Sequence, residues 1–232
     1  MPAVPNPTWL YWKSKPLSGA LNMAWDDLCL NQSTAIGAPL LRFYCWTRPT
    51  TTFGYFQKHE TVREIEASTS LIRRPTGGGI VPHSSDWTYS LVFPPASNWY
   101  RIRAKESYAQ LHQWIQLAFS LLNIESQLNP ISIQEGPGSC FVGAEESDLL
   151  YKGKKLAGAA QRRSQEGFLI QGSIQPPFKF VERSDWEKAL LQAAVEAWGI
   201  QWKEWIPPST FAEQASELAH SKYESAKHNQ RR

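Results

Sequence analysis

One cysteine of the chain stands in a setting that suits a nucleophile. Cys140 lies between glycines in "EGPGSCFVG" (135–143), whereas Cys29 and Cys45 fall inside segments that we expect to be regular and buried. A thiolate attacks carbonyl carbons, and neighbouring cations favour the thiolate over the thiol. A lone cysteine in a loop can also be chemically inert. Cys140 is therefore a candidate nucleophile, with an unreactive thiol as the alternative.

A second candidate lies in the segment "GKKLAGAAQRR" (153–163). Lys154 and Lys155 are adjacent, so on a strand their side chains point to opposite faces. One of them shares the face of Ala157 and Ala159, whose small side chains leave room for a ligand against the sheet. The alternative is an edge-strand lysine whose ammonium simply reaches solvent.

The segment "IRRPTGGGIVPH" (72–83) contains three consecutive glycines, which lose much backbone freedom on folding. A phosphate-binding loop would run from glycines into a helix, but here a strand pattern follows and neither GxGxxG nor GKS/GKT occurs. The alternatives are a tight turn between strands, with Arg73 and Arg74 on a solvated edge, or a bare backbone that contacts another ligand. Paired zinc ligands and HExxH are also absent from the sequence, so we expect no metal site.

Hydrophobic periodicity indicates the elements that must position these residues. We expect helices over 18–32, over 107–124 and, after a capping box of Ser184 and Glu187, to about Trp198. We expect strands over 39–46, 86–93 and 167–174, and two more around a turn at 152–154. Tight turns between strands indicate an α/β (α+β) fold with a mixed, largely antiparallel sheet flanked by helices.

Composition limits the class of protein. The net charge of +3 is too small to predict nucleic-acid binding, and three cysteines in no spaced pattern favour a reducing compartment. The chain shows neither a signal-peptide core nor an apolar run of membrane-spanning length, so we expect a cytoplasmic protein that binds no membrane. Residues 1–210 read as a single catalytic domain, and residues 211–232 as a polar helix or tail.

Four blocks of the sequence resemble one superfamily, in that superfamily's order. "RRPTGGGIVPHSSDWTYSLVFP" and "GKKLAGAAQRR" are similar to the signature segments of the lipoate–protein ligase, octanoyltransferase and biotin ligase superfamily, and "GALNMAWDDLCL" and "LLRFYCWTRPTTTFGYFQ" to its opening segments. The resemblance covers about residues 18 to 175. It implies a biotin/lipoyl ligase-like catalytic domain with an acyl tunnel beneath the glycine-rich loop. The substrate-binding residues that it implies are Arg73, Arg74, Thr76, Gly77, Gly78, Gly79, His83, Asp86, Gly158, Ala160 and Gln161.

Within the superfamily, the sequence is most similar to the cysteine-dependent octanoyltransferases, on "SCF", "PTTTFGYFQ" and "DWTYS", and on a chain without room for an accessory C-terminal domain. Two features depart from that group: Gly79 stands where its members often carry arginine, and Gln171 where many relatives carry histidine. The alternative is an ATP-dependent lipoate–protein ligase, which requires ATP and Mg²⁺. Weaker alternatives are a non-catalytic acyl- or carrier-binding protein and a biotin ligase, whose "GRGR"-type segment is missing.

The transferase resemblance implies a mechanism without a cofactor. Cys140 takes an octanoyl or lipoyl group from acyl carrier protein as a thioester, and Lys155 contacts the acyl carbonyl and stabilises the oxyanion. The acceptor is the lysine of an E2 lipoyl domain or of the glycine-cleavage H protein. We expect Arg73 and Arg74 to meet the carrier at the tunnel entrance, His83 to orient the loop or relay a proton, and Asp86 to hold the loop through backbone hydrogen bonds.

Overall fold

A computed structural model describes residues 7–66, 70–131 and 144–231. The main sheet has eight strands in the order β11-β1-β2-β6-β10-β9-β8-β7. Its strands are β1 (Thr8–Lys13), β2 (Leu40–Tyr44), β6 (Trp87–Phe93), β7 (Gln127–Leu128), β8 (Leu149–Tyr151), β9 (Lys154–Ser164), β10 (Gly167–Ile174) and β11 (Gln201–Glu204). The β1 strand pairs in parallel with β2 and β11, whereas the pairs from β2 to β7 are antiparallel. The expected mixed, largely antiparallel sheet is confirmed.

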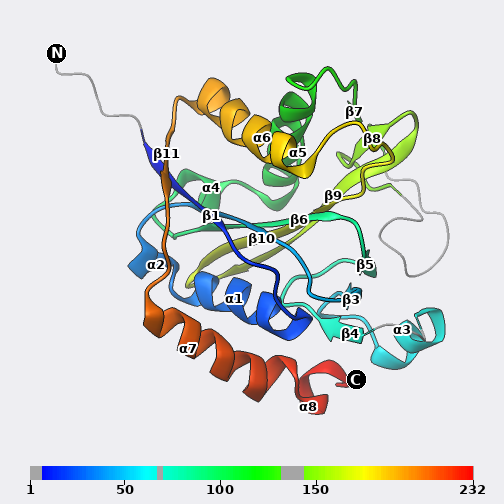
Figure 1. The fold of residues 1–232 in the computed structure, drawn as a ribbon, viewed down its shortest axis with the longest axis vertical. Coiled ribbons are helices and arrows are strands. Elements are labelled where there is room, and N and C mark those ends of the chain that lie inside the picture. Colours follow the sequence, from blue (N-terminus) through cyan, green and yellow to red (C-terminus); the bar gives the residue numbers. More distant parts are fainter. Residues whose placement is uncertain (1–6, 67–69, 132–143, 232) are drawn as a thin grey trace.

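A second sheet of three strands lies beside the main one (Figure 1). Its strands are β3 (Thr50–Phe53), β4 (Ser70–Arg73) and β5 (Val81–His83), with β3 in the middle, parallel to β4 and antiparallel to β5. The glycine-rich segment 74–80 therefore connects the two edge strands of this small sheet. The sequence indicated that a strand, and not a helix, follows the glycines, and this is what the structure shows.

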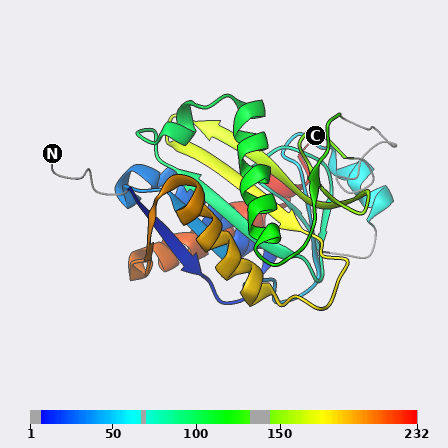
Figure 2. The ribbon, with the colours of Figure 1, turned by 90° about the horizontal axis from the view of Figure 1, so that it is seen from above.

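Helices lie on both faces of the main sheet. The described helices are α1 (Gly19–Asn31), α2 (Ser33–Ile36), α3 (His59–Ile65), α4 (Asn98–Arg101), α5 (Ala104–Ser120), α6 (Arg183–Trp198), α7 (Ser209–Leu218) and α8 (Ala226–Asn229), with a π-helical turn at Ala219–Tyr223. Helices α5 and α6 pack side by side on one face, and α1 and α7 lie on the other (Figures 1 and 2). Among the described helices, none is both long and apolar enough to cross a membrane.

The larger hydrophobic core lies between the sheet and helices α5 and α6. Alternate residues of β6, namely Trp87, Tyr89, Leu91 and Phe93, point into it, while Val92 joins the core on the α1 side. Every residue of β6 and β10 is buried, because both faces of these central strands are covered. The central strands therefore form a rigid support for any site built on them.

The expected capping box is wrong. Helix α6 begins at Arg183, one residue before Ser184, and its N-cap is Glu182, which makes no side-chain capping bond. Glu187 instead accepts a hydrogen bond from Arg183 at 2.8 Å and pairs with Lys13 at 2.8 Å. The predicted end at Trp198 is confirmed, with Gly199 in the left-handed conformation beyond it.

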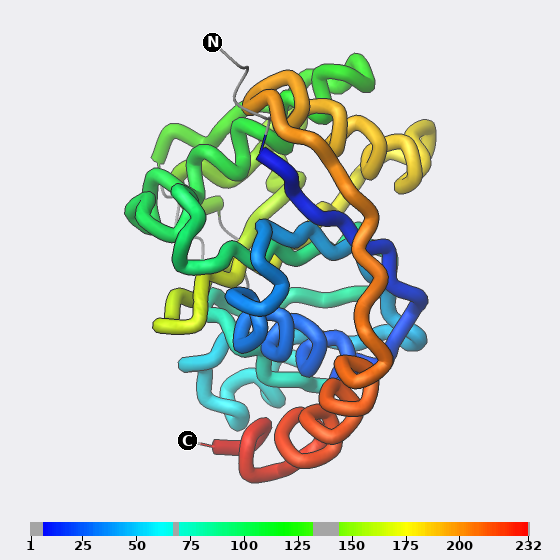
Figure 3. Tube along the Cα trace, turned by 90° about the vertical axis from the view of Figure 1, so that its left-hand side faces the viewer, coloured from blue at the N-terminus to red at the C-terminus, as the bar shows by residue number. Residues whose placement is uncertain are grey.

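The segment after β11 packs on the body of the molecule. Helix α7 and the π-helical turn lie against α1, and α8 contacts β4 (Figure 3). Tyr223 is fully buried and donates a hydrogen bond to Asp27 of α1 at 3.0 Å. This packing brings residues 226–231 next to the small sheet that carries the glycine-rich segment.

Candidate active site

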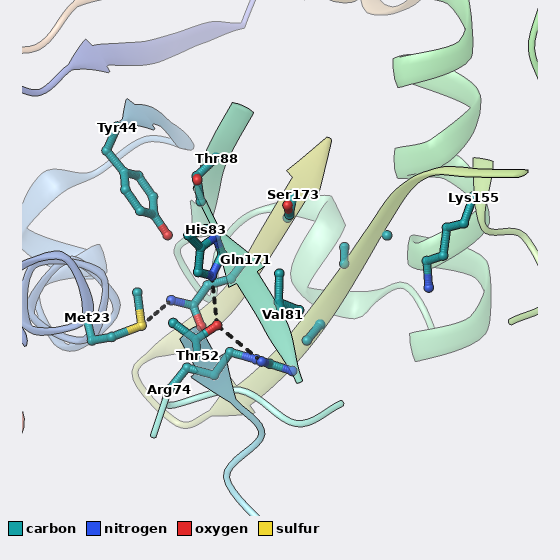
Figure 4. A pocket seen from close by; sticks show the side chains of 14 residues that line it. Met23, Tyr44, Thr52, Arg74, Val81, His83, Thr88, Lys155, Gln171 and Ser173 are labelled. Atoms are coloured by element: carbon teal, nitrogen blue, oxygen red, sulfur yellow. Dashed lines mark hydrogen bonds between the residues drawn. The ribbon is translucent and has the colours of Figure 1, made fainter. Parts of the chain in front are cut away.

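A narrow cavity of about 50 Å³ lies where strands β9 and β10 face the small sheet (Figure 4). That space holds a few water molecules at most. The side chains or backbone that line it belong to Met23, Tyr44, Thr52, Arg74, Val81, His83, Thr88, Lys155, Gly158, Ala159, Ala160, Gln171, Gly172 and Ser173. Of the residues expected at the site, the cavity thus brings together Arg74, His83, Lys155, Gly158 and Ala160.

One wall of the cavity consists of small residues on β9 and β10. A methyl group built on Gly172 would lie 2.1 Å from Cζ of Tyr89, whose ring is fully buried. A methyl group on Gly158 would lie 2.7 Å from Cε of Lys155. Both distances are far below a van der Waals contact. A side chain at position 172 would meet a buried ring, whereas one at position 158 would displace the end of the Lys155 side chain. At these glycines the backbone itself forms the surface of the cavity.

Lys155 occupies one end of this cavity (Figure 4). Its ammonium lies 2.6 Å from Oδ2 of Asp148, and only 7% of the lysine side chain is exposed. The pairing of β8 with β9 shifts register between Leu149 and Leu150, which breaks the simple alternation expected for this strand. Ala157, expected beside the ligand, is in the hydrophobic core instead. Lys155 itself is turned toward the cavity, as predicted.

Gln171 lies at the other end of the cavity and joins two segments by hydrogen bonds. Its Oε1 accepts a hydrogen bond from Thr76 at 2.7 Å, and its Nε2 donates to Oδ2 of Asp26 at 2.7 Å. Asp26 in turn pairs with Arg42 at 2.8 Å, and both side chains are buried. The residue that departs from the expected histidine therefore ties the glycine-rich segment to helix α1 through a neutral amide.

His83 is held on both sides of its ring. Nδ1 lies 2.8 Å from Oδ2 of Asp86, Nε2 lies 2.8 Å from Oγ1 of Thr52, and the ring stacks on Trp46 at 4.1 Å. Asp86 is predicted to accept backbone hydrogen bonds, but its contacts found here come from side chains: His83, Thr88 at 2.9 Å and Ser173 at 2.7 Å.

The same contacts control the charge of Asp86. Burial raises the pKa of this carboxyl, but the positive charge of His83 and the hydrogen bonds from His83, Ser173 and Thr88 outweigh burial. The net result is a pKa below the ordinary value, so Asp86 is a carboxylate at neutral pH. It fixes the ring orientation of His83 in the cavity wall.

The two arginines are not at a solvated edge, which corrects that expectation. Arg73 is 1% exposed and donates to the backbone carbonyls of Gly54, Tyr55, Gln57, His228, Asn229 and Arg231. Arg74 is 4% exposed, donates to the carbonyl of Gly77 and lines the cavity. Arg73 is thus an internal brace between the small sheet and the C-terminal segment.

The glycine triplet serves a close approach of two backbones. A methyl group on Gly54 would lie 1.9 Å from the carbonyl oxygen of Gly78, so these segments touch without side chains between them. Gly78 has a φ of 82°, which favours glycine, whereas a methyl group on Gly77 would meet nothing within 4 Å. At Gly78 the bare backbone therefore packs against another segment of the same chain, at Gly54.

Two further predicted residues have different outcomes. Gln161 accepts a hydrogen bond from Ser107 at 3.1 Å and donates to the carbonyl of Ala104 at 3.2 Å, so it contacts α5 and is not among the cavity residues. Cys140 lies outside the described residues. Its role stays a prediction from sequence.

Sequence reasoning missed several lining residues, including Met23 and Thr52. Both belong to blocks that carry the family resemblance, "GALNMAWDDLCL" and "PTTTFGYFQ". The resemblance itself was therefore the signal that pointed to them. No periodicity distinguishes them from core residues.

Comparison with known families assigns this fold and site to one family of catalytic domains. Residues 18–178 match the family described as "Lipoyl protein ligase A/B catalytic domain". The chain belongs to this family.

Curated relatives narrow the resemblance. The chain is 35% identical over 184 residues to Octanoyltransferase LipM of Carboxydothermus hydrogenoformans and 34% identical over 173 residues to that of Oceanobacillus iheyensis. Each match covers 72% of this chain, and the chain spans only 64% and 63% of the two relatives. The match therefore covers most of this chain but leaves about a third of each relative unmatched.

Solved structures show the same fold at lower sequence identity. Protein Ta0514 from T. acidophilum with bound lipoic acid superposes with a TM-score of 0.79 at 18% identity, covering 97% of this chain and 99% of that one. Lipoate-protein ligase A bound with ATP gives a TM-score of 0.79 at 18% identity, covering 97% and 98%. At this identity the likeness supports the architecture alone.

Proposed function

We propose that the chain transfers an octanoyl or lipoyl group from acyl carrier protein to the lysine of an E2 lipoyl domain or of the glycine-cleavage H protein, in the cytoplasm. The observation that carries the proposal is the buried Lys155 ammonium at the end of a cavity walled by small residues. Relatives 31–35% identical over 72% of the chain are named octanoyltransferases, which supports the same reaction class.

The proposed reaction exchanges one thioester for another and then forms an amide. The Cys140 thiolate adds to the carrier-bound acyl carbonyl, the carrier thiolate leaves and takes up a proton, and the acyl group remains on Sγ. The acceptor amine then adds to this thioester, the amide forms and the Cys140 thiol is released. Lys155 donates hydrogen bonds to the oxyanion that develops in each step. No cofactor enters this balance.

The proposed acyl chain must fit into the cavity. A space of about 50 Å³ is too small for an eight-carbon chain. The wall of β9 and β10 belongs to the central sheet and has no slack, so binding requires the small sheet and the segment 74–80 to move away from it. The hydrogen bond from Thr76 to Gln171 of β10 is the contact that such a movement breaks.

The test is capture of the acyl-enzyme. Incubation with octanoyl carrier protein in the absence of ATP should add one octanoyl group to the intact protein, as a mass increment that hydroxylamine removes. Cys140→Ser should lose the hydroxylamine-sensitive adduct, whereas Cys29→Ser and Cys45→Ser should retain it. ATP-dependent transfer of free lipoate by Cys140→Ser would instead refute the transferase mechanism.

One observation favours a second candidate, an ATP-dependent lipoate–protein ligase. Gly79 completes a glycine triplet that resembles the one in the ligases. This alternative needs ATP and Mg²⁺, and makes Cys140 dispensable. Transfer assayed with octanoyl carrier protein, and with free lipoate plus ATP, separates the two functions. Transfer in neither assay, with retained acyl binding, would favour the non-catalytic binder.

A further inference from the structure

Strand β8 covers only the first part of the β9 edge. Pairing with β8 runs from Tyr151 opposite Lys154 to Leu149 opposite Ala157, and within residues 7–66, 70–131 and 144–231 no strand pairs with β9 beyond Ala157 on that side. An open edge presents backbone N–H groups that need acceptors. The N–H of Ala159 finds one in the hydroxyl of Tyr108, at 3.2 Å. Tyr108 comes from helix α5, so a helix side chain replaces the missing strand.

The same hydroxyl of Tyr108 donates its proton to Oδ1 of Asp148. Burial, the negative charge of Asp148 and this hydrogen bond all raise the pKa of Tyr108 well above its ordinary value. Tyr108 therefore stays protonated throughout the neutral range and keeps its proton for Asp148. One hydroxyl thus links the strand edge, as acceptor, to the carboxylate, as donor.

Asp148 is fully buried and uses both carboxylate oxygens. Oδ2 lies 2.6 Å from the Lys155 ammonium and accepts the backbone N–H of Glu145 at 2.7 Å, while Oδ1 accepts from Tyr108. A buried carboxylate with this many donors is firmly placed, because losing any of them leaves a charge unsatisfied. The carboxylate therefore offers Lys155 a fixed anchor.

Gly158 leaves the space in which the end of the Lys155 side chain lies. Its missing side chain leaves the space that Cε and Nζ of Lys155 fill, since a methyl group there would lie 2.7 Å and 3.0 Å from these atoms. The lysine therefore lies flat over the β9 backbone, with its ammonium directed by Asp148. Its position depends on the anchor, because the side chain has four rotatable bonds of its own.

We infer that Asp148 and Tyr108 are positioning residues of the acyl-transfer site, which hold the Lys155 ammonium over Gly158 so that it can meet an acyl oxygen. The inference rests on the proposed function for the identity of that oxygen. The placement of Lys155 is a separate matter and can be measured without any substrate. Neither Asp148 nor Tyr108 lines the cavity itself, so both act through Lys155.

The first experiment measures placement. Modification of Lys155 by an amine-reactive ester is followed by peptide mass spectrometry, relative to Lys188, whose side chain is 73% exposed. In Asp148→Asn the bond that holds the ammonium inward weakens, and we expect Lys155 to be modified about tenfold faster; in Tyr108→Phe, about threefold faster. Tyr100→Phe is the matched control, because Tyr100 also donates to β9, at the carbonyl of Ser164. It should leave the rate unchanged.

The second experiment measures transfer. Loss of positioning lowers kcat about tenfold to a hundredfold in Tyr108→Phe, with the KM for octanoyl carrier protein nearly unchanged, since carrier contacts stay intact. Should Asp148→Asn fail to fold, Tyr108→Phe decides the matter, with its melting temperature recorded beside that of Tyr100→Phe. A wild-type modification rate and kcat in the folded Tyr108→Phe protein overturn the inference. If the wild-type protein transfers no acyl group but the modification rates change as expected, the proposed function fails and the positioning role stands.

Discussion

The two walls of the cavity are built on opposite principles. The β9–β10 wall gains its shape from missing side chains, at Gly158 and Gly172, and includes β10, in which every residue is buried. The opposite wall, on the small sheet and the segment 74–80, gains its shape from hydrogen bonds of Thr52, Arg74 and Thr76. The first wall is therefore sensitive to added atoms, and the second to lost bonds.

This difference separates rigidity from adaptability. Close packing resists deformation, so we expect the β9–β10 wall to keep its shape. Hydrogen bonds at a small sheet can exchange partners at modest cost, because each contributes about 1 kcal/mol net. If the proposed acyl transfer holds, we expect the second wall to be the one that moves to admit the acyl chain.

The largest effect is expected from a substitution of Lys155, at the end of the β9–β10 wall. Replacing Lys155→Met removes the ammonium but keeps an unbranched side chain, and we expect kcat for octanoyl transfer to fall about 100- to 1,000-fold, as for loss of an oxyanion donor. Lys154→Met is the matched control on the exposed neighbouring residue. A Lys155→Met enzyme within about threefold of wild type in kcat would show that the ammonium is not used in the reaction.

Adding one methyl group to each wall tests whether the two walls differ in packing. Gly172→Ala places it 2.1 Å from a buried ring atom of Tyr89, and should lower the free energy of unfolding by about 3 kcal/mol. Gly77→Ala places it in open space and should change that free energy by less than about 0.5 kcal/mol. Urea denaturation measures both. Equal effects would mean that the walls do not differ in packing.

The pH dependence of stability probes His112, which supports the Lys155 end from helix α5. Burial lowers its pKa to about 4, against the charge of Asp148 and the hydrogen bond to the Tyr108 carbonyl, which raise it, and with Lys155, which lowers it further. Because the folded state then binds its proton less readily than the unfolded state, stability is complete above the unfolded pKa of 6.5 and falls as the pH drops toward 4.

Between pH 7 and pH 5 this histidine should cost about 2 kcal/mol of unfolding free energy. In His112→Gln the corresponding part of the loss should disappear. His220→Gln, at a side chain that is 88% exposed, should keep the wild-type slope. Denaturation curves at the two pH values test this, and an unchanged slope in His112→Gln would contradict the assignment to His112.

The smallest effect belongs to a single bond of the adaptable wall. Thr76→Val removes the hydroxyl that donates to Gln171 at 2.7 Å, while it keeps the shape of the side chain. We expect a loss of about 1 kcal/mol in unfolding free energy. Thr8→Val, at an exposed position on β1, should lose less than half of this. A loss of about 3 kcal/mol at Thr76 would mean that the second wall is as intolerant as the first.

Local pattern was sufficient to predict much of the fold. The helices at 19–31, 104–120 and 183–198 and the strands β2, β6, β9 and β10 follow from periodicity and turn residues near their observed positions. The capping box failed because a capping motif is short enough to occur by chance, and Glu187 has better partners in Arg183 and Lys13. The sequence pattern cannot weigh such tertiary partners.

The candidate site was predictable where the resemblance supplied it and not where partners come from afar. Lys155 and His83, which the resemblance implied, both line the cavity. Arg73 does not line the cavity. The carbonyls that it binds belong to segments 16 to 158 residues away in the chain, and no local sequence pattern predicts such contacts. The anchoring of Lys155 by Asp148 and Tyr108 was missed for the same reason.

The brace around Arg73 has a consequence for the order of folding. Its guanidinium bonds to His228 and Arg231 span 155 and 158 residues of chain, and such distant contacts carry a high entropic cost of closure. The strand pairs β9–β10 and β8–β9, by contrast, connect neighbours in sequence. We therefore expect the base of the glycine-rich segment to assemble after the central strand pairs.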